Sequence, residues 1–207
     1  MPNLNGGHLF IRCLKQEGVK RVFTIVGDTI LPLVDAAADE GIEFIDTRHE
    51  GAAMHMADGY ARASGLPGVI LAGQNGPGAT NLVTGIAQAA AAFSPVISIA
   101  GALSTVDVVQ DAFQGVDQQS LFTPITKKTW TVKRTQHIPT MFSEAFRVAM
   151  KPRRGPVHLN LPRDILSKSV NFKSSEYSQT NKSHKISSAK TNIIKKAAKM
   201  ISSATQP

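Results

Sequence analysis

The segment GVILAGQNGPGATNLVTGIAQAAAAFSPVISIAG, residues 68–101, contains two apolar runs separated by a glycine-rich turn and a stretch of small residues. The runs at 68–73 and 95–101 are short and carry no charge, which is typical of strands that are buried on both faces. The residues between them, 79–92, have the composition and spacing of a helix. A buried strand, a helix and a second buried strand in this order predict a parallel pair joined by a crossover helix.

The same alternation of strands and helices continues on both sides of this segment. Further strands are predicted at 21–27, 42–46, 129–133 and 155–162. Further helices are predicted at 4–17, 29–39, 49–65 and 138–151. We therefore predict an α/β fold in which a parallel sheet of about six strands is covered by helices on both faces.

Several polar and glycine residues follow the strands at the edge where ligands bind. Open parallel sheets bind ligands beyond the carboxyl ends of their strands. Gly27 and Asp28 follow the first strand, and Glu50 follows the second. The loop at 74–78 follows the third. The 26-residue polar segment 102–127 follows the fourth and is long for a compact domain, so we interpret it as a substrate loop.

Common ligand-binding motifs do not account for these features. The loop GQNGPGATN at 73–81 lacks the Gly-Lys-Ser/Thr ending of a nucleotide-binding P-loop, and VGDTI at 26–30 lacks the three-glycine dinucleotide fingerprint. His49 and His55 are six residues apart, which is not a zinc-ligand spacing, so we predict no metal site in this chain. No Gly-x-Ser-x-Gly nucleophile motif occurs.

The net charge of +8 is concentrated near the end of the chain. Residues 1–166 contain 15 Lys and Arg against 14 Asp and Glu, whereas residues 167–207 contain 8 Lys against one Glu. The second part is rich in Ser and Lys, as solvated linkers are, so we predict no nucleic-acid binding. No apolar run reaches the about 18 residues of a membrane-spanning helix, so we expect no membrane association. The only cysteine, Cys13, fits a reducing compartment, so we expect a cytoplasmic location.

The stretch RHEGAAMHMADGYARASG, residues 48–65, places a carboxylate where a strand turns into a small-residue helix. A charge at that point is costly unless a neighbour or a ligand pairs with it. One interpretation is an acidic residue stabilised by the helix dipole. The other is a buried glutamate that hydrogen-bonds a heteroaromatic ring nitrogen and shares its proton.

Five motifs together resemble the N-terminal pyrimidine-binding domain of thiamine diphosphate (TPP) enzymes, most closely the acetolactate synthase (acetohydroxyacid synthase) branch. They are RHEGAAMHMADGYARASG, GQNGPGATNLVTGIAQA, SPVISIAG, DAFQGVDQ and RGPVHLNLPRD. The resemblance covers about residues 4–166. It implies that Glu50 is the catalytic glutamate, which hydrogen-bonds N1′ of the aminopyrimidine and activates the cofactor for ylid formation. The reaction implied is decarboxylation or carboligation of a 2-oxo acid.

The resemblance also assigns residues around Glu50. Cofactor-binding residues would be Gly27, Gly76, Pro77, Gly78 and Asn81. Substrate-side residues would be Asp28, Phe113 and Gln114. Simpler interpretations stand beside these roles: a tight turn for the glycines, helix capping for Asn81, and loop packing for Phe113 and Gln114.

Two departures from the acetolactate synthase pattern bear on the substrate. Val26-Gly27-Asp28 replaces the usual Pro-Gly-Gly, and an acid beside the expected pocket disfavours an anionic 2-oxo acid unless it is paired or turned away. The loop AGQNGPG is more similar to that of sulfoacetaldehyde acetyltransferases. A sulfoacetaldehyde acetyltransferase-like enzyme, or another TPP-dependent lyase or decarboxylase, is therefore the alternative.

The family binds Mg²⁺ and the diphosphate in a separate domain, through a Gly-Asp-Gly motif that this sequence lacks. We predict a pyrimidine domain at 1–166, a Ser/Lys-rich linker at 167–190 and the start of a truncated central domain at 191–207. The chain would be a fragment of a larger enzyme, the pyrimidine-domain subunit of a split enzyme or, as the non-enzyme alternative, a regulatory or oligomerisation module. The sequence leaves FAD in the parent enzyme undetermined.

The resemblance and the small residues together predict partners. The helices around 50–64 and 79–91 are rich in alanine and glycine, which permits close approach of another helix. We expect a homodimer or homotetramer through these helices. The active site would be completed by the diphosphate-binding domain of a partner chain.

Overall fold

The computed structural model describes residues 4–106, 112–170 and 188–206. Two predicted segments lie partly outside these residues. They are the substrate loop 102–127, of which 107–111 are not described, and the Ser/Lys-rich linker 167–190, of which 171–187 are not described. Among the described residues, no helix combines the length and the apolar character needed to cross a membrane.

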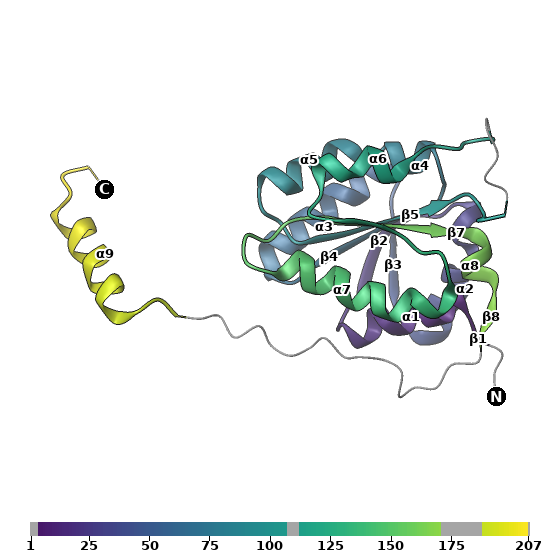
Figure 1. Cartoon of the computed structure of the whole chain (residues 1–207), viewed down its shortest axis with the longest axis horizontal. Helices are drawn as coiled ribbons and strands as arrows, with labels where there is room; N and C mark the ends of the chain where they lie inside the picture. Colours follow the sequence, from purple (N-terminus) through teal and green to yellow (C-terminus); the bar gives the residue numbers. More distant parts are fainter. Residues whose placement is uncertain (1–3, 107–111, 171–187, 207) are drawn as a thin grey trace.

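A six-stranded sheet forms the centre of the fold, and all of its strands are parallel (Figure 1). Its strand order is β3-β2-β4-β5-β7-β6. The strands are β2 (Arg21–Ile25), β3 (Glu43–Asp46), β4 (Gly68–Ala72), β5 (Val96–Ala102), β6 (Thr129–Thr131) and β7 (Val157–Pro162). Every residue of β4 and β7 is buried, as expected for strands covered on both faces. The predicted α/β class and sheet are confirmed.

Helices cover both faces of this sheet (Figure 1). On one face lie α1 (Gly6–Gln16), α2 (Leu31–Glu40) and α7 (Ile138–Met150), whose apolar residues form a core that includes Phe10 and Phe142. On the other face lie α3 (Glu50–Ser64), α5 (Val83–Ala91) and α6 (Gln118–Phe122), with a core that includes Met54 and Phe122. The two cores hold the sheet rigidly enough to position the loops at its carboxyl edge.

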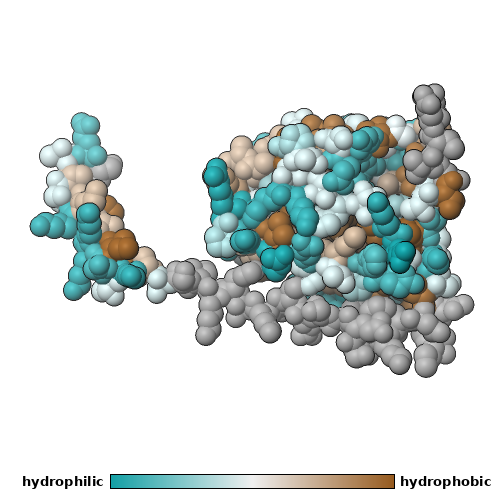
Figure 2. All heavy atoms as spheres, in the orientation of Figure 1, coloured by the Kyte–Doolittle hydropathy of each residue, from teal (hydrophilic) through white to brown (hydrophobic). Residues whose placement is uncertain are grey.

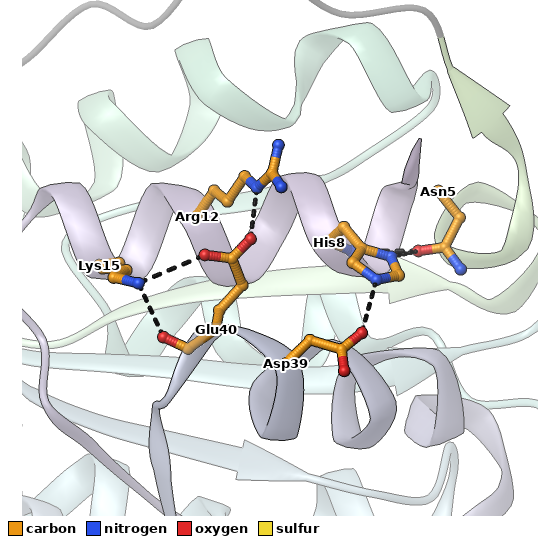
Figure 3. A network of polar contacts seen from close by, with 6 residues as sticks. All are labelled: Asn5, His8, Arg12, Lys15, Asp39 and Glu40. Atoms are coloured by element: carbon orange, nitrogen blue, oxygen red, sulfur yellow. Dashed lines mark hydrogen bonds and ion pairs between the residues drawn. The ribbon is translucent and has the colours of Figure 1, made fainter. Parts of the chain in front are cut away.

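A row of polar contacts joins α1 to α2 at the surface (Figure 3). Arg12 Nε donates to Glu40 Oε1 at 2.6 Å, Lys15 Nζ donates to the Glu40 carbonyl oxygen at 2.8 Å, and His8 Nε2 lies 3.4 Å from Asp39 Oδ2. Burial acts to raise the pKa of Glu40, but hydrogen bonds from Arg12 and Lys15 outweigh it and hold that pKa below its ordinary value. Exposed ion pairs of this kind contribute at most about 1 kcal/mol each, so the network supports helix packing that the apolar core establishes.

Some local elements differ from those predicted. The helix predicted at 79–92 is divided into α4 (Pro77–Thr80) and α5, and the helix predicted at 29–39 begins with the 3₁₀ turn η1 (Asp28–Ile30) before α2. Four short elements were not predicted: β1 (Leu4–Asn5), β8 (Ser169–Val170), α8 (Arg163–Ser167) and α6. The strands β1 and β8 form a separate antiparallel pair. Elements of two to five residues are too short to show a hydrophobic period.

Two further 3₁₀ turns, η2 (Thr123–Ile125) and η3 (Thr135–His137), flank β6. The last helix, α9 (Thr191–Ser203), has no buried residue. Its apolar side chains Ile193, Ile194, Met200 and Ile201 are exposed, and brown spheres mark apolar residues on this helix in Figure 2. The segment 191–207, predicted as the start of a further domain, thus contains a helix with an exposed apolar side.

Candidate functional site at the carboxyl edge of the sheet

The backbones that follow β2 and β4 touch at the edge where the candidate residues lie. A Cβ atom on Gly27 would lie 2.5 Å from the Gly73 carbonyl carbon, and one on Gly73 would lie 2.1 Å from the Gly27 nitrogen. Only glycine permits this approach. The contact brings the loop at 74–78 beside the turn that contains Asp28.

Glu50 is positioned by the turn between β3 and α3. Thr47 Oγ1 lies 3.1 Å from two acceptors, the carbonyl oxygens of Thr24 and His49, which ties this turn to the neighbouring strand β2. His49 caps α3, because its Nδ1 accepts a hydrogen bond from the Gly51 N–H at 3.0 Å. Glu50 is consequently the first residue of the helix and is only 8% exposed.

The two carboxylate oxygens of Glu50 have different surroundings. Asn81 Nδ2 donates to Oε2 at 2.9 Å, whereas Oε1 accepts no hydrogen bond from any residue that the structure describes. A Cβ atom on Gly78 would lie 3.1 Å from Oε1, so the absence of a side chain there leaves room beside this oxygen. Asn81 was predicted as a cofactor residue or a helix cap; its side chain points to Glu50 instead of capping a helix.

The glycine loop also holds the segment around Gln114. Gly76 has φ of +60°, and a Cβ on it would lie 2.4 Å from the Gln114 carbonyl oxygen. Gln74 Nε2 donates to Gln114 Oε1 at 2.6 Å, and Asn75 Nδ2 donates to the Gln114 carbonyl oxygen at 3.1 Å. Gln114 itself has φ of +59°, an uncommon conformation for a residue with a side chain. The sequence analysis identified Gln114 but not the two amides that hold it; their position directly after a buried strand was the available signal.

Asp28 forms an ion pair. An unpaired acid at this position would disfavour an anionic substrate, and that condition is not met here. Arg163 Nη1 donates to Asp28 Oδ2 at 2.8 Å, and both side chains are more than half exposed. Arg163 is the first residue of α8, directly after β7, and the sequence analysis did not single it out. The Phe113 side chain is 84% exposed, so it is not packed against Glu50. Pro77 begins α4, where its fixed φ suits the first helical turn.

The described residues contain no group of three or more His, Cys, Asp or Glu side chains arranged to hold a metal ion. The arrangement at this edge is instead a single buried carboxylate with one oxygen fixed and the other beside a glycine. Such a group can hold a proton between itself and a nitrogen of a flat ring.

Comparison with known proteins gives a consistent result. Residues 4–121 match the family described as "Thiamine pyrophosphate enzyme, N-terminal TPP binding domain". The chain is 41% identical over 213 residues to a probable acetolactate synthase large subunit of Methanocaldococcus jannaschii, covering 99% of this chain and 35% of that protein.

Two other relatives have similar names. The acetolactate synthase large subunit of Buchnera aphidicola subsp. Schizaphis graminum is 39% identical over 216 residues, which cover 100% of this chain and 37% of the relative. The acetolactate synthase isozyme 3 large subunit of Escherichia coli is 42% identical over 168 residues, which cover 81% of this chain and 29% of the relative. The chain thus spans about a third of the length of the curated relatives it matches.

Proposed function

The chain belongs to the thiamine pyrophosphate enzyme family, as an N-terminal TPP-binding domain like that of acetolactate synthase large subunits, and we propose that Glu50 binds the aminopyrimidine ring of TPP. The observation that carries this proposal is the asymmetry of the Glu50 carboxylate. Asn81 holds Oε2, while Oε1 lies beside Gly78 and accepts no hydrogen bond from the described residues.

The residues fit this ring for a simple steric and electrostatic reason. A heteroaromatic nitrogen that approaches Oε1 supplies the hydrogen-bond partner that the oxygen lacks. Gly78 has no side chain to obstruct the ring, and the Asn81 bond prevents the carboxylate from turning away. When bound, the cofactor supplies the organic chemistry next to a substrate carbonyl group. The role of Glu50 is to hold a proton at the ring nitrogen N1′.

The remaining residues shape the site around that ring. We assign Gly27, Gly76 and Pro77 to its backbone wall, because the close contacts at Gly27 and Gly76 admit only glycine. We assign Asp28, Phe113 and Gln114 to the substrate side. The Arg163 pairing of Asp28 reduces the repulsion that this acid would exert on an anionic 2-oxo acid.

We propose that the whole enzyme decarboxylates or joins 2-oxo acids, as the names of its relatives suggest. Magnesium and the diphosphate would be held by a separate domain of a partner chain. The division into a domain at 1–166, a linker at 167–190 and a further domain beginning at 191 belongs to this proposal. The single cysteine supports a cytoplasmic location.

Assembly through α3 and α5 is part of the same proposal. The two helices pack closely, since a Cβ on Gly85 would lie 2.4 Å from Met54 Cγ. Met56 on α3 and Phe93 just after α5 are exposed apolar side chains. An apolar surface over small residues supports a homodimer or homotetramer that uses this face.

The test is thiamine binding by the 207-residue chain, followed by NMR with thiamine labelled at N1′ with ¹⁵N. Glu50→Ala should weaken binding about tenfold or more, because it removes a charge-assisted hydrogen bond. Glu50→Gln should bind the ring but leave N1′ unprotonated at pH 7. Glu43→Gln, which changes an exposed glutamate on the neighbouring strand β3, is the matched control and should match the unchanged chain. An N1′ shift in Glu50→Gln equal to that of the unchanged chain would contradict the assignment.

A further inference from the structure

A cavity lies at the amino edge of the sheet, at the opposite end from the candidate site. It has a volume of about 500 Å³, within the range of pockets that hold a small organic ligand. Three of its lining residues come just before strands: Phe93 before β5, Lys127 before β6 and Pro156 before β7. These strands are parallel, so the residues that precede them lie at the end of the sheet away from the carboxyl edge (Figure 1). The cavity therefore shares no residue with the site around Glu50.

Four cations line this cavity, and none of its lining residues is acidic. They are Lys127, Lys151, Arg153 and Arg154, and none of them makes an ion pair with a described residue. Burial lowers the pKa of Lys127 below its ordinary value, and the positive charge of Lys151 adds to this effect. The repulsion among these cations is not balanced by a described carboxylate, so a bound polyanion would relieve it.

Backbone carbonyl groups hold two of the cations in place. Lys127 Nζ donates to the carbonyl oxygens of Val148 and Lys151, at 2.5 and 3.1 Å. Arg154 Nη1 donates to the Gly65 carbonyl oxygen at 3.2 Å. The ammonium group of Lys127 keeps a third hydrogen for a ligand, and the guanidinium group of Arg154 keeps further N–H donors. Two donors are thus preorganised without neutralisation of their charge.

An aromatic ring and a guanidinium group contact each other in the same lining. Arg153 Cζ lies 5.0 Å from the centre of the Phe93 ring, and Phe93 is 48% exposed. Both residues have a positive φ, +54° for Phe93 and +56° for Arg153, which a chain ordinarily reserves for glycine. Side chains held in this conformation cost stability and are concentrated at functional sites. An aromatic face and a guanidinium plane are both surfaces on which a flat heterocycle stacks.

We propose that this cavity binds a nucleoside di- or triphosphate. The base stacks on the paired side chains of Phe93 and Arg153. The phosphates accept hydrogen bonds from Lys127, Lys151 and Arg154, which are charged donors of the kind that phosphate oxygens prefer. A base alone or a phosphate alone uses only one part of this lining. The site goes beyond the proposed function, because it lies at the other end of the sheet from the proposed thiamine site.

The test compares four probes by calorimetric titration of the 207-residue chain without Mg²⁺: ATP, AMP, adenosine and inorganic triphosphate. ATP should bind most tightly. Inorganic triphosphate lacks the stacked base and AMP lacks two phosphates, so each should bind about tenfold more weakly. Adenosine, which has no charge to pair with the cations, should bind at least about a hundredfold more weakly. Equal affinities for ATP and inorganic triphosphate, or for ATP and adenosine, would overturn the proposal.

Two cavity variants separate the two parts of the ligand. Phe93→Gly has a backbone conformation that suits glycine, and it should weaken ATP about tenfold and leave inorganic triphosphate unchanged. Lys151→Gln changes an exposed residue and should weaken both probes alike, by about tenfold. An ATP affinity that either variant leaves unchanged would refute the assignment and would direct attention to the Lys-rich residues 167–207 instead. If Phe93→Gly does not fold, Phe93→Leu decides, because it keeps an apolar side chain and removes the ring.

Two matched controls lie outside the cavity. Met56→Ser changes an exposed apolar residue of the face proposed for assembly, which Phe93 also borders. Lys168→Gln removes the charge of another exposed lysine. Both variants should bind ATP like the unchanged chain, and a loss in Met56→Ser equal to that in Phe93→Gly would mean that Phe93 acts through assembly and would refute the site. Glu50→Ala should also leave ATP binding unchanged, which makes the result independent of the proposed function.

Discussion

Lowering the pH from 8 to 5 is expected to destabilise this chain through a single buried side chain, His158. The residue is completely buried on β7. The ring of Phe122 stacks on it with centroids 3.9 Å apart, and its two nitrogens contact Ser98 and Asn160. Burial lowers the pKa of His158 from its ordinary value of 6.5 to about 3, although the Asn160 bond acts in the opposite direction.

The sign and size of the effect follow from the two states. In the unfolded chain this histidine titrates near 6.5, whereas in the folded chain it stays neutral down to about pH 3. Above pH 6.5 neither state binds the proton, so the folded state suffers no penalty. As the pH falls below 6.5 only the unfolded state gains a proton, and stability is lost until the folded state titrates as well. At pH 5 the loss is about 30-fold in the folding equilibrium, or about 2 kcal/mol.

The measurement is urea unfolding at pH 8, 6.5 and 5, on the unchanged chain and on His158→Gln. Glutamine does not titrate, and its amide can still donate to Asn160. The difference in unfolding free energy between the two proteins should shift by about 2 kcal/mol in favour of the variant between pH 8 and pH 5. The other histidines are present in both proteins and cancel in this difference. His158→Asn serves if the first variant is too unstable to measure.

A constant free-energy difference across this pH range would refute the reasoning. It would mean that the ring takes up a proton in the folded state near its ordinary pKa. In that case the folded state would hold a charged imidazolium between Ser98 and Asn160.

Three other substitutions test local backbone and side-chain contacts. Gly76→Ala should destabilise the chain by about 1–3 kcal/mol in urea unfolding, because its Cβ meets the Gln114 carbonyl oxygen at 2.4 Å and its φ is +60°. Gly59→Ala, in the interior of α3 with nothing within 4 Å of the new Cβ, should instead stabilise by about 0.5–1 kcal/mol. Asn81→Asp should cost about 1–3 kcal/mol at pH 7, since it replaces the donor to Glu50 by a second carboxylate, and the loss should shrink when the pH is lowered to 4. An Asn81→Asp variant with unchanged stability at pH 7 would show that this hydrogen bond is absent in solution.

The sheet could be predicted from the sequence because the composition of its central strands indicates that they are buried on both faces. The runs at 68–73 and 95–101 contain only apolar and small residues, so they fit a strand covered on both faces and little else. A strand-helix-strand order then leaves a parallel connection as the main solution. The edge strand β6 was predicted from TWTVK, which is more polar, and the structure gives it only three residues.

The contacts within the site could not be predicted in the same way, because they join residues distant in the chain. Gln74 and Asn75 reach Gln114 across about forty positions, and no local pattern encodes that distance. The sequence analysis correctly placed the loop at 74–78 and the segment around Gln114 at the same edge of the sheet. It did not predict that they are in contact. Short elements such as α6 and α8 are stabilised by neighbours and carry no period of their own.

Glu50 shows what the structure adds to a residue that the sequence had already selected. From the sequence, a helix-dipole role and a ligand-binding role were both open. A purely structural carboxylate at a helix start is stabilised by the helix dipole and does not need open space beside either oxygen. Here the Asn81 side chain donates to Oε2, and the residue beside Oε1 is Gly78, which has no side chain that could donate. The dipole stabilises the charge in either case, so the unpaired oxygen is what separates the two roles and favours a ligand.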